Sequence, residues 1–231
     1  MTLDPQLILD SLPLIAQGLG ITLKLLFYSS LFGIALAVIT LLMRISGRWY
    51  LSWPAQAYIY FFRGTPILVQ IFIIYYGLPQ FGFIRNSILW PILREPFTCC
   101  VIALGLNSGA YVSEILRGGV LGVDKGLTEA GKALGLSSPQ RFIYITAPIA
   151  IRLSLPAYSN EFISTLKATA LASTVTLMDV TGVARTLVSQ TYAPYEIFIA
   201  AAILYLAFAW ISYVALAWLE ARASRYVKKG N

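Results

Sequence analysis

The sequence predicts an all-α integral membrane protein whose chain crosses the bilayer five times. Only 12% of its 231 residues are charged, about half the share of a soluble domain, and 58% are hydrophobic. Four uncharged stretches each approach the ~20 residues that span the hydrocarbon core, namely Leu25–Met43, Gly64–Ile84, Pro96–Ser113 and Ile197–Leu219. A fifth stretch, about 155–178, carries Glu161 and Lys167. A soluble protein with five buried helices fits poorly, because such helices are usually shorter and have amphipathic neighbours.

These stretches predict one transmembrane domain over residues 1–231. We expect spans at about 19–43, 56–78, 96–117, 153–178 and 196–220, and a loop at about 119–150. The first span is expected to be retained, because Asp4 and Asp10 stand where a signal peptide is basic and no A-x-A site follows. Residues 1–18 are expected to form an amphipathic helix at the outer face.

Positive charge predicts the orientation of the chain. If the N-terminus lies outside, eleven basic residues lie on the cytoplasmic side and three outside, so this is the orientation that the positive-inside rule favours. The eleven are Arg44, Arg48, Arg117, Lys125, Lys132, Arg141, Arg152, Arg222, Arg225, Lys228 and Lys229; the three are Arg85, Arg94 and Arg185. The C-terminus is then cytoplasmic, and the net charge of +7 is explained without a nucleic-acid partner.

The second span contains a predicted helix break. Pro66 should kink or interrupt the helix, and broken helices often line transport pathways. Arg63 lies near the cytoplasmic end of this span, where its long side chain can reach the interface. A simple interfacial anchor is an equally good explanation for Arg63.

The third span combines small residues with a polar face. Gly105 and Gly109 form a small-xxx-small pattern, which suits either packing within the chain or a contact between subunits. Asn107, Tyr111 and Glu114 fall at i, i+4 and i+7, so they share a helix face that should turn toward protein or water. The adjacent Cys99 and Cys100 cannot form an ordinary disulfide and are expected to pack as small apolar residues.

The chain has no histidine, which excludes metal sites with histidine ligands and catalytic histidine bases.

The loop after the third span predicts two short helices. Gly126 to Ala133 nearly spells a phosphate-binding loop, but Ala133 lacks the hydroxyl that holds Mg²⁺ and no strand precedes it. Instead, small and apolar residues at i, i+3, i+4 and i+7 indicate a helix over 124–134 that ends at Gly135. That apolar face comprises Leu127, Ala130, Gly131 and Leu134. Ser137 and Gln140 have capping-box spacing for a second helix, which Pro148 is expected to limit.

The fourth span carries charges that need partners. Six residues separate Glu161 from Lys167, which places them on different helix faces and argues against a mutual ion pair. Asn160 lines up with Lys167. Each charge can pair structurally with another helix or subunit, or it can face a transport pathway. A carboxylate at Glu161 could hold the ammonium or cationic side chain of a zwitterionic substrate, whose charges must be matched in a low-dielectric core.

The loop also resembles a known family. Glu129-Ala130-Gly131, then Gly135, Ile145 and Ala147-Pro148, have the spacing of the EAA loop in membrane subunits of bacterial binding-protein-dependent ABC importers. Gly131 and Ala147 depart from the usual alanine and leucine. Further motifs resemble the polar amino-acid uptake branch, and from Asn160 onward the second permease of histidine, lysine/arginine/ornithine and opine importers: Phe62–Gln70, Ala110–Gly119, Leu155–Glu161 and Leu166–Leu171.

The resemblance implies a type I importer permease in the bacterial inner membrane, and not an enzyme. It implies a second permease or a copy of this chain as partner, two cytoplasmic ATPase subunits that bind ATP and Mg²⁺, and an external amino-acid-binding protein; no cofactor or metal is expected in this chain. The expected ATPase-coupling residues are Leu127, Glu129, Ala130, Gly131, Leu134 and Gly135, and the expected pathway residues are Asn107, Tyr111, Glu114, Asn160, Glu161 and Lys167.

The implied activity is ATP-driven uptake of polar, cationic amino acids or opines by alternating access. The alternatives are a permease for neutral polar amino acids such as glutamine, an ion-gradient-driven carrier, and a membrane scaffold with no transport path. A gradient-driven carrier would usually be longer, with an internal repeat, and would need no EAA helices. A scaffold would have no use for the inward-facing Asn107, Glu114 and Glu161.

Overall fold

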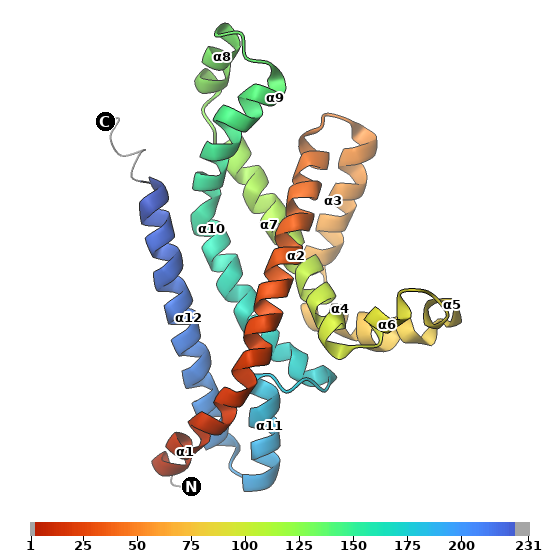
Figure 1. The fold of residues 1–231 in the computed structure, drawn as a ribbon, viewed down its shortest axis with the longest axis vertical. Helices are drawn as coiled ribbons and strands as arrows, with labels where there is room; N and C mark the ends of the chain where they lie inside the picture. The colour runs from red at the N-terminus through yellow and green to blue at the C-terminus, as the bar shows by residue number, and fades with distance from the viewer. Residues whose placement is uncertain (1–2, 225–231) are drawn as a thin grey trace.

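The computed structural model describes residues 3–224, and this part of the chain is helical without strands. Three long helices and two bent helix pairs make up most of it (Figure 1). The helices are α1 (Pro5–Ile15), α2 (Leu19–Ile45), α3 (Trp49–Gly64), α4 (Ile67–Phe72), α5 (Gly82–Arg85), α6 (Trp90–Leu93), α7 (Pro96–Leu121), α8 (Lys125–Ala133), α9 (Ser138–Arg141), α10 (Ala147–Ala168), α11 (Val180–Thr191) and α12 (Pro194–Ser224). Arg225, Lys228 and Lys229, which entered the charge count, lie outside the described residues.

The candidate membrane spans follow the predicted order. Three helical segments are long and apolar enough to cross a bilayer: Pro5–Ile45, Pro96–Leu121 and Pro194–Ala223. The other two candidates are bent pairs: Trp49–Gly64 with Ile67–Gln80, at 106°, and Ser138–Val175 with Val180–Thr191, at 49°. Counting each pair as one span gives five. The first segment is longer than expected, because the predicted separate helix at its start runs on into α2 through a short 3₁₀ turn.

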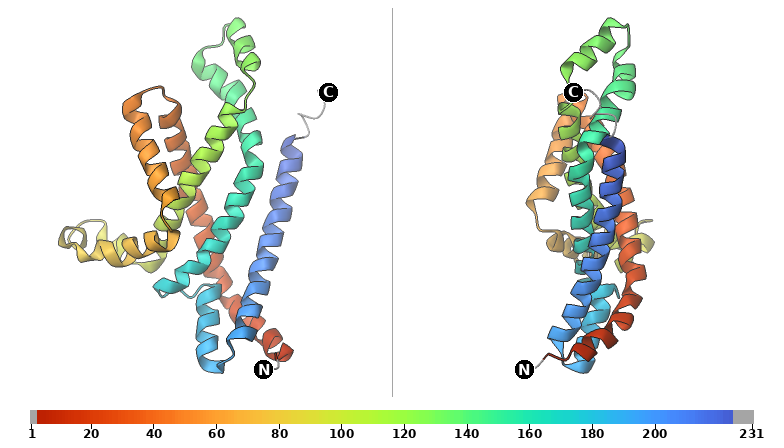
Figure 2. Two further views of the ribbon diagram at one scale, coloured as in Figure 1. Left: turned by 180° about the vertical axis from the view of Figure 1, so that it is seen from behind. Right: turned by 90° about the vertical axis from the view of Figure 1, so that its left-hand side faces the viewer.

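The two ends of the bundle carry different elements. The hairpin of α8 and α9 lies beyond one end, whereas α1 and α11 lie at the other, so the start of α1 and the hairpin are far apart in every view (Figures 1 and 2). α12 begins beside α1 and α11 and ends at the same end as the hairpin (Figure 2). The two termini of the described chain therefore lie at opposite ends of the bundle (Figures 1 and 2).

α2 and α7 pack closely because glycines line their contact. A Cβ at Gly33 would lie 3.2 Å from the Gly105 carbonyl oxygen, and a Cβ at Gly109 would lie 3.1 Å from the Gly33 carbonyl oxygen. The Tyr58 hydroxyl on α3 donates a 2.6 Å hydrogen bond to the Leu106 carbonyl in the same region. The small-xxx-small pattern therefore serves packing within the chain, one of the two uses left open by the sequence.

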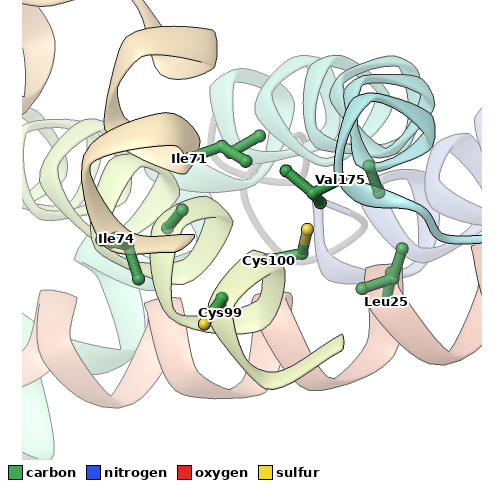
Figure 3. Packing of buried hydrophobic residues seen from close by; sticks show 8 residues of the cluster. Leu25, Ile71, Ile74, Cys99, Cys100 and Val175 are labelled. Carbon is green, nitrogen blue, oxygen red and sulfur yellow. The ribbon is translucent and has the colours of Figure 1, made fainter. Parts of the chain in front are cut away.

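Two apolar clusters hold the bundle together. The first joins α2, α4, α7 and the 3₁₀ segment Thr169–Val175, and both cysteines are fully buried in it as free thiols (Figure 3). This confirms their predicted role as small packing residues. The second joins α1, α11 and α12 at the opposite end from the hairpin, around residues that include Ile15, Val180 and Ile197.

A buried carboxylate fixes the second bent pair. Asp179 is fully buried and caps α11, because its side chain accepts hydrogen bonds from the backbone N–H groups of Thr181 at 3.2 Å and Gly182 at 3.0 Å. The Tyr205 hydroxyl on α12 donates to the same carboxylate at 3.1 Å. The α1–α2 segment meets this turn so closely that a Cβ at Gly18 would lie 2.5 Å from the Asp179 carbonyl carbon. These contacts tie four helices together at one bend.

The expectation that Pro148 limits the helix before the fourth span is wrong. The chain stays helical from Ser138 through the wider π-type turn Phe142–Thr146 into α10, where Pro148 occupies the first turn. A proline in the first turn of a helix costs little, and the wider turn before it accommodates the lost backbone donor.

Candidate functional site

The predicted break at Pro66 is present, and side-chain amides satisfy the backbone groups that it frees. Thr65 and Pro66 are extended between α3 and α4. The buried Gln70 side chain donates to the carbonyl oxygens of Phe62 and Thr65, each at 3.0 Å. Asn107 on α7 donates to the Phe62 carbonyl at 2.9 Å and to the Gln70 side chain at 3.2 Å. The bend is therefore a fixed feature, because unpaired carbonyls at this depth would be costly.

An open pocket of about 330 Å³, here called the Glu161 pocket, lies beside this break. It is lined by Ile67, Leu104, Asn107, Tyr111, Glu161, Ser164, Thr165 and Ala168. The break, α7 and α10 thus each contribute to its wall. Glu161 accepts a long 3.4 Å hydrogen bond from the Thr165 hydroxyl, and within residues 3–224 it forms no ion pair. Its carboxylate is therefore the charged group that this pocket offers to a ligand.

The six expected pathway residues do not all meet at this pocket. Asn107, Tyr111 and Glu161 line it together. Glu114 lies farther along α7 and lines a different pocket. Asn160 and Lys167 are exposed and line neither pocket. The predicted separation of Glu161 from Lys167 agrees with this placement.

A second open pocket, here called the arginine pocket, has a volume of about 400 Å³ and lies between α2, α3 and α7. It is lined by Arg44, Gln56, Ile59, Tyr60, Arg63, Gly64, Tyr111 and Glu114. Glu114 accepts hydrogen bonds from Arg117 at 2.7 to 3.0 Å and pairs more loosely with Arg44 at 3.7 Å. The Arg63 guanidinium lies over the Tyr111 ring, 5.0 Å from its centroid. Arg63 therefore faces this pocket and does not act only as an interfacial anchor.

The α8–α9 hairpin forms as the sequence predicts. α8 ends in a Schellman motif, because the Leu136 N–H donates to the Gly131 carbonyl and the Gly135 N–H donates to the Lys132 carbonyl, both at 3.0 Å. Gly135 has the positive φ of +81° that this motif requires. Ser137 caps α9 in a capping box with Gln140, whose side chain accepts from the Ser137 N–H at 2.8 Å.

The predicted apolar face of α8 is divided in the structure. Leu127, Ala130 and Leu134 are exposed, with Leu134 82% accessible. Gly131 is buried against its own chain, where an added Cβ would lie 2.6 Å from the Ile145 side chain. The structure therefore removes Gly131 from the exposed face, because a glycine is needed where the hairpin folds back on itself. Glu129 is exposed beside Ala130.

Comparison with known proteins identifies the family. The model of the family described as binding-protein-dependent transport system inner membrane component matches residues 29–225. The chain belongs to this family. It is therefore a multi-pass permease subunit of an inner-membrane ABC transport system, and its resemblance to that family is confirmed.

Similar permeases cover nearly the whole chain. The octopine transport system permease protein OccM of Rhizobium meliloti is 47% identical over 220 residues, which cover 95% of this chain and 90% of OccM. The histidine/lysine/arginine/ornithine transport system permease protein HisM of Salmonella typhimurium is 39% identical, covering 91% of this chain and 89% of HisM. The crystal structure of an amino acid ABC transporter with histidines contains a chain that is 37% identical, with a TM-score of 0.85, covering 96% of this permease and 100% of that chain.

Sequence reasoning missed several residues that shape the permease. The sequence analysis named Gln70 only as the last residue of a motif. An amide four residues after a proline in an apolar run is, however, a signal for a side chain that hydrogen-bonds to the backbone carbonyls freed by the proline. Asp179 was overlooked because it falls between two predicted elements. Tyr58 gave no signal, because one tyrosine among fourteen looks like an interfacial residue.

Proposed function

We propose that this permease carries cationic amino acids or opines across the inner membrane, driven by ATP hydrolysis in separate subunits. The named relatives transport octopine or histidine, lysine, arginine and ornithine. These ligands share a cationic group beside a carboxylate. The ATPase subunits hold ATP and Mg²⁺, and the permease contributes the pathway.

The observation that carries the substrate class is the free carboxylate of Glu161. It faces a pocket whose other lining side chains carry no charge. A carboxylate held inside a membrane protein is costly unless a cation meets it. Among the described residues, Arg63 acts on this carboxylate electrostatically but forms no ion pair with it, so a cationic substrate is the natural direct partner. A neutral substrate such as glutamine would match only its α-ammonium group, and a membrane scaffold would leave this carboxylate without a use.

The proposed assembly follows from the two ends of the bundle. The hairpin lies on the cytoplasmic side, in agreement with the positive charge of Arg44, Arg48 and Arg141 at that end. The exposed Leu127, Glu129, Ala130 and Leu134 contact an ATPase subunit there, and Gly135 shapes the end of α8. A second permease, or a copy of this chain, completes the pathway, and an external binding protein delivers the substrate at the α1–α11 end. Closure of the ATPase dimer moves the hairpins and opens the pathway alternately to each side.

The test is uptake into proteoliposomes that contain the complete transporter. Arginine or histidine uptake should require ATP and the binding protein and should persist when protonophores and sodium ionophores collapse ion gradients. Uptake that follows an ion gradient without ATP would establish the carrier alternative. Preferential uptake of glutamine over all cationic amino acids would contradict the assigned substrate class.

A further inference from the structure

The arginine pocket has more positive than negative charge. Arg44 and Arg63 line it, Arg117 lies at its edge, and Glu114 is the acidic residue among them. The Glu114 carboxylate is engaged mainly by Arg117, with contacts at 2.7 to 3.0 Å, and is 3.7 Å from the Arg44 guanidinium. These three guanidinium groups and one carboxylate have a net charge of +2, and Glu161 of the neighbouring pocket is a second carboxylate that acts on Arg63 electrostatically.

Two of these arginines retain unused hydrogen-bonding capacity. The Nε of Arg44 is buried, and it has no hydrogen-bond partner within residues 3–224. The Arg63 guanidinium lies over the Tyr111 ring, and no carboxylate of the described chain forms an ion pair with it. A cation–π contact does not use the N–H donors of a guanidinium, so they can still form bidentate hydrogen bonds to a carboxylate. A buried donor without an acceptor is costly, so an anion that accepts from it would be stabilised.

The arginine pocket also adjoins the Glu161 pocket. Tyr111 lines both, so its side chain forms a shared wall between a site with a free carboxylate and a site with excess guanidinium groups. The two pockets meet at the break, because Arg63 and Gly64 before it line the arginine pocket and Ile67 after it lines the Glu161 pocket; Arg44, in the last turn of α2, extends the arginine pocket toward the hairpin end. A ligand that carries both charges would therefore meet opposite electrostatic partners on the two sides of Tyr111.

We infer that the arginine pocket binds the carboxylate group of the transported amino acid, on the hairpin side of the Glu161 pocket. Arg63 and Arg44 are the binding residues, and Tyr111 positions the Arg63 guanidinium. The inference rests on the proposed function, because it takes an amino acid as the substrate. It adds a separate recognition element for the carboxylate that all such substrates share.

The test compares two ligands that differ by one carboxylate. Arginine and its decarboxylated form agmatine carry the same guanidinium and a terminal nitrogen, so only arginine can use the arginine pocket. We would titrate each into the complete transporter in nanodiscs by calorimetry, without nucleotide and without the binding protein. The variants are Arg63→Gln and Arg44→Gln, with Arg48→Gln as a matched control, because Arg48 is an exposed arginine at the same end that does not line the pocket.

Arg63→Gln and Arg44→Gln should each weaken arginine binding at least tenfold and leave agmatine binding unchanged. Arg48→Gln should change neither. Equal weakening for both ligands, or unchanged arginine binding in both variants, would overturn the inference. So would loss of the second permease from the complex in the two variants, because the arginines would then be holding a partner's acidic group.

The same titration separates this inference from the proposed function. Glu161→Gln should weaken both arginine and agmatine, because both present a cation. If Glu161→Gln has no effect while Arg63→Gln selectively weakens arginine, the carboxylate site stands and the assigned role of Glu161 fails. If wild-type transporter binds neither ligand in this titration, the inference is wrong, whereas the proposed function is decided by the uptake assay.

Discussion

Gly135 provides a sharp test of the coupling role of the hairpin. Its φ is +81°, and an added Cβ would meet nothing within 4 Å, so Gly135→Ala introduces backbone strain without a steric clash. Forcing a residue with a Cβ into this conformation costs about 1–2 kcal/mol. The Schellman hydrogen bonds at the end of α8 depend on that conformation. A cost of about 1.4 kcal/mol shifts a conformational equilibrium tenfold, so the population of hairpins outside the docking shape should rise about tenfold.

Gly47 supplies a matched control. It has a φ of +71°, an added Cβ there would also meet nothing within 4 Å, and it lies in the loop between α2 and α3. Gly47→Ala therefore carries the same local strain away from the hairpin. We expect substrate-stimulated ATPase activity and uptake in proteoliposomes to fall several-fold for Gly135→Ala and to stay near wild type for Gly47→Ala. Equal behaviour of the two variants would refute the view that the shape of the hairpin couples the ATPase to transport.

Three further predictions concern orientation, docking and the break. A cysteine at Ser138 should be protected from an impermeant thiol reagent in intact cells and labelled in inside-out vesicles; the reverse pattern would invert the proposed topology. Ala130→Leu should reduce co-purification of the ATPase because Ala130 is on the exposed face of α8, whereas Lys132→Leu should be tolerated; comparable losses would contradict the docking surface. Asn107→Ala removes hydrogen bonds to Phe62 and Gln70, worth about 0.5–1.5 kcal/mol each, and should lower the melting temperature of the purified transporter; an unchanged value would argue against its role at the break.

Local sequence signals were sufficient to predict the structure where a single residue determines the backbone conformation. Pro66 predicted the break because proline removes a backbone donor, and Gly135 predicted the end of α8 because glycine accepts positive φ at little cost. Long apolar helices were predictable because bilayer thickness sets the length of a segment that can span it. The same reasoning gave a wrong prediction at Pro148, where the helix continues. The wider turn before Pro148 depends on how the hairpin packs, which the local sequence does not encode.

The composition of the pockets was less predictable, because it depends on contacts between helices distant in the sequence. Periodicity placed Asn107, Tyr111 and Glu114 on one face of α7, but the structure distributes them over two pockets with Tyr111 between. The partner of that face, the bend after α3, could not be positioned from the sequence. For the same reason Gly131 looked like part of a docking face, although the fold-back of α9 makes it an internal contact.

The most direct test of the account is uptake by Glu161→Gln, measured in parallel for a cationic and a neutral amino acid, together with the yield of intact complex. The substitution keeps the side-chain shape and removes its charge, and a lost charge-assisted contact is worth about 1.5–3 kcal/mol, or roughly 10- to 150-fold in affinity. We expect normal assembly, unchanged affinity of the external binding protein, and a loss of uptake that is much larger for the cationic substrate. An equal loss for both substrates with poor assembly would show that Glu161 is a structural partner and does not belong to the substrate pathway.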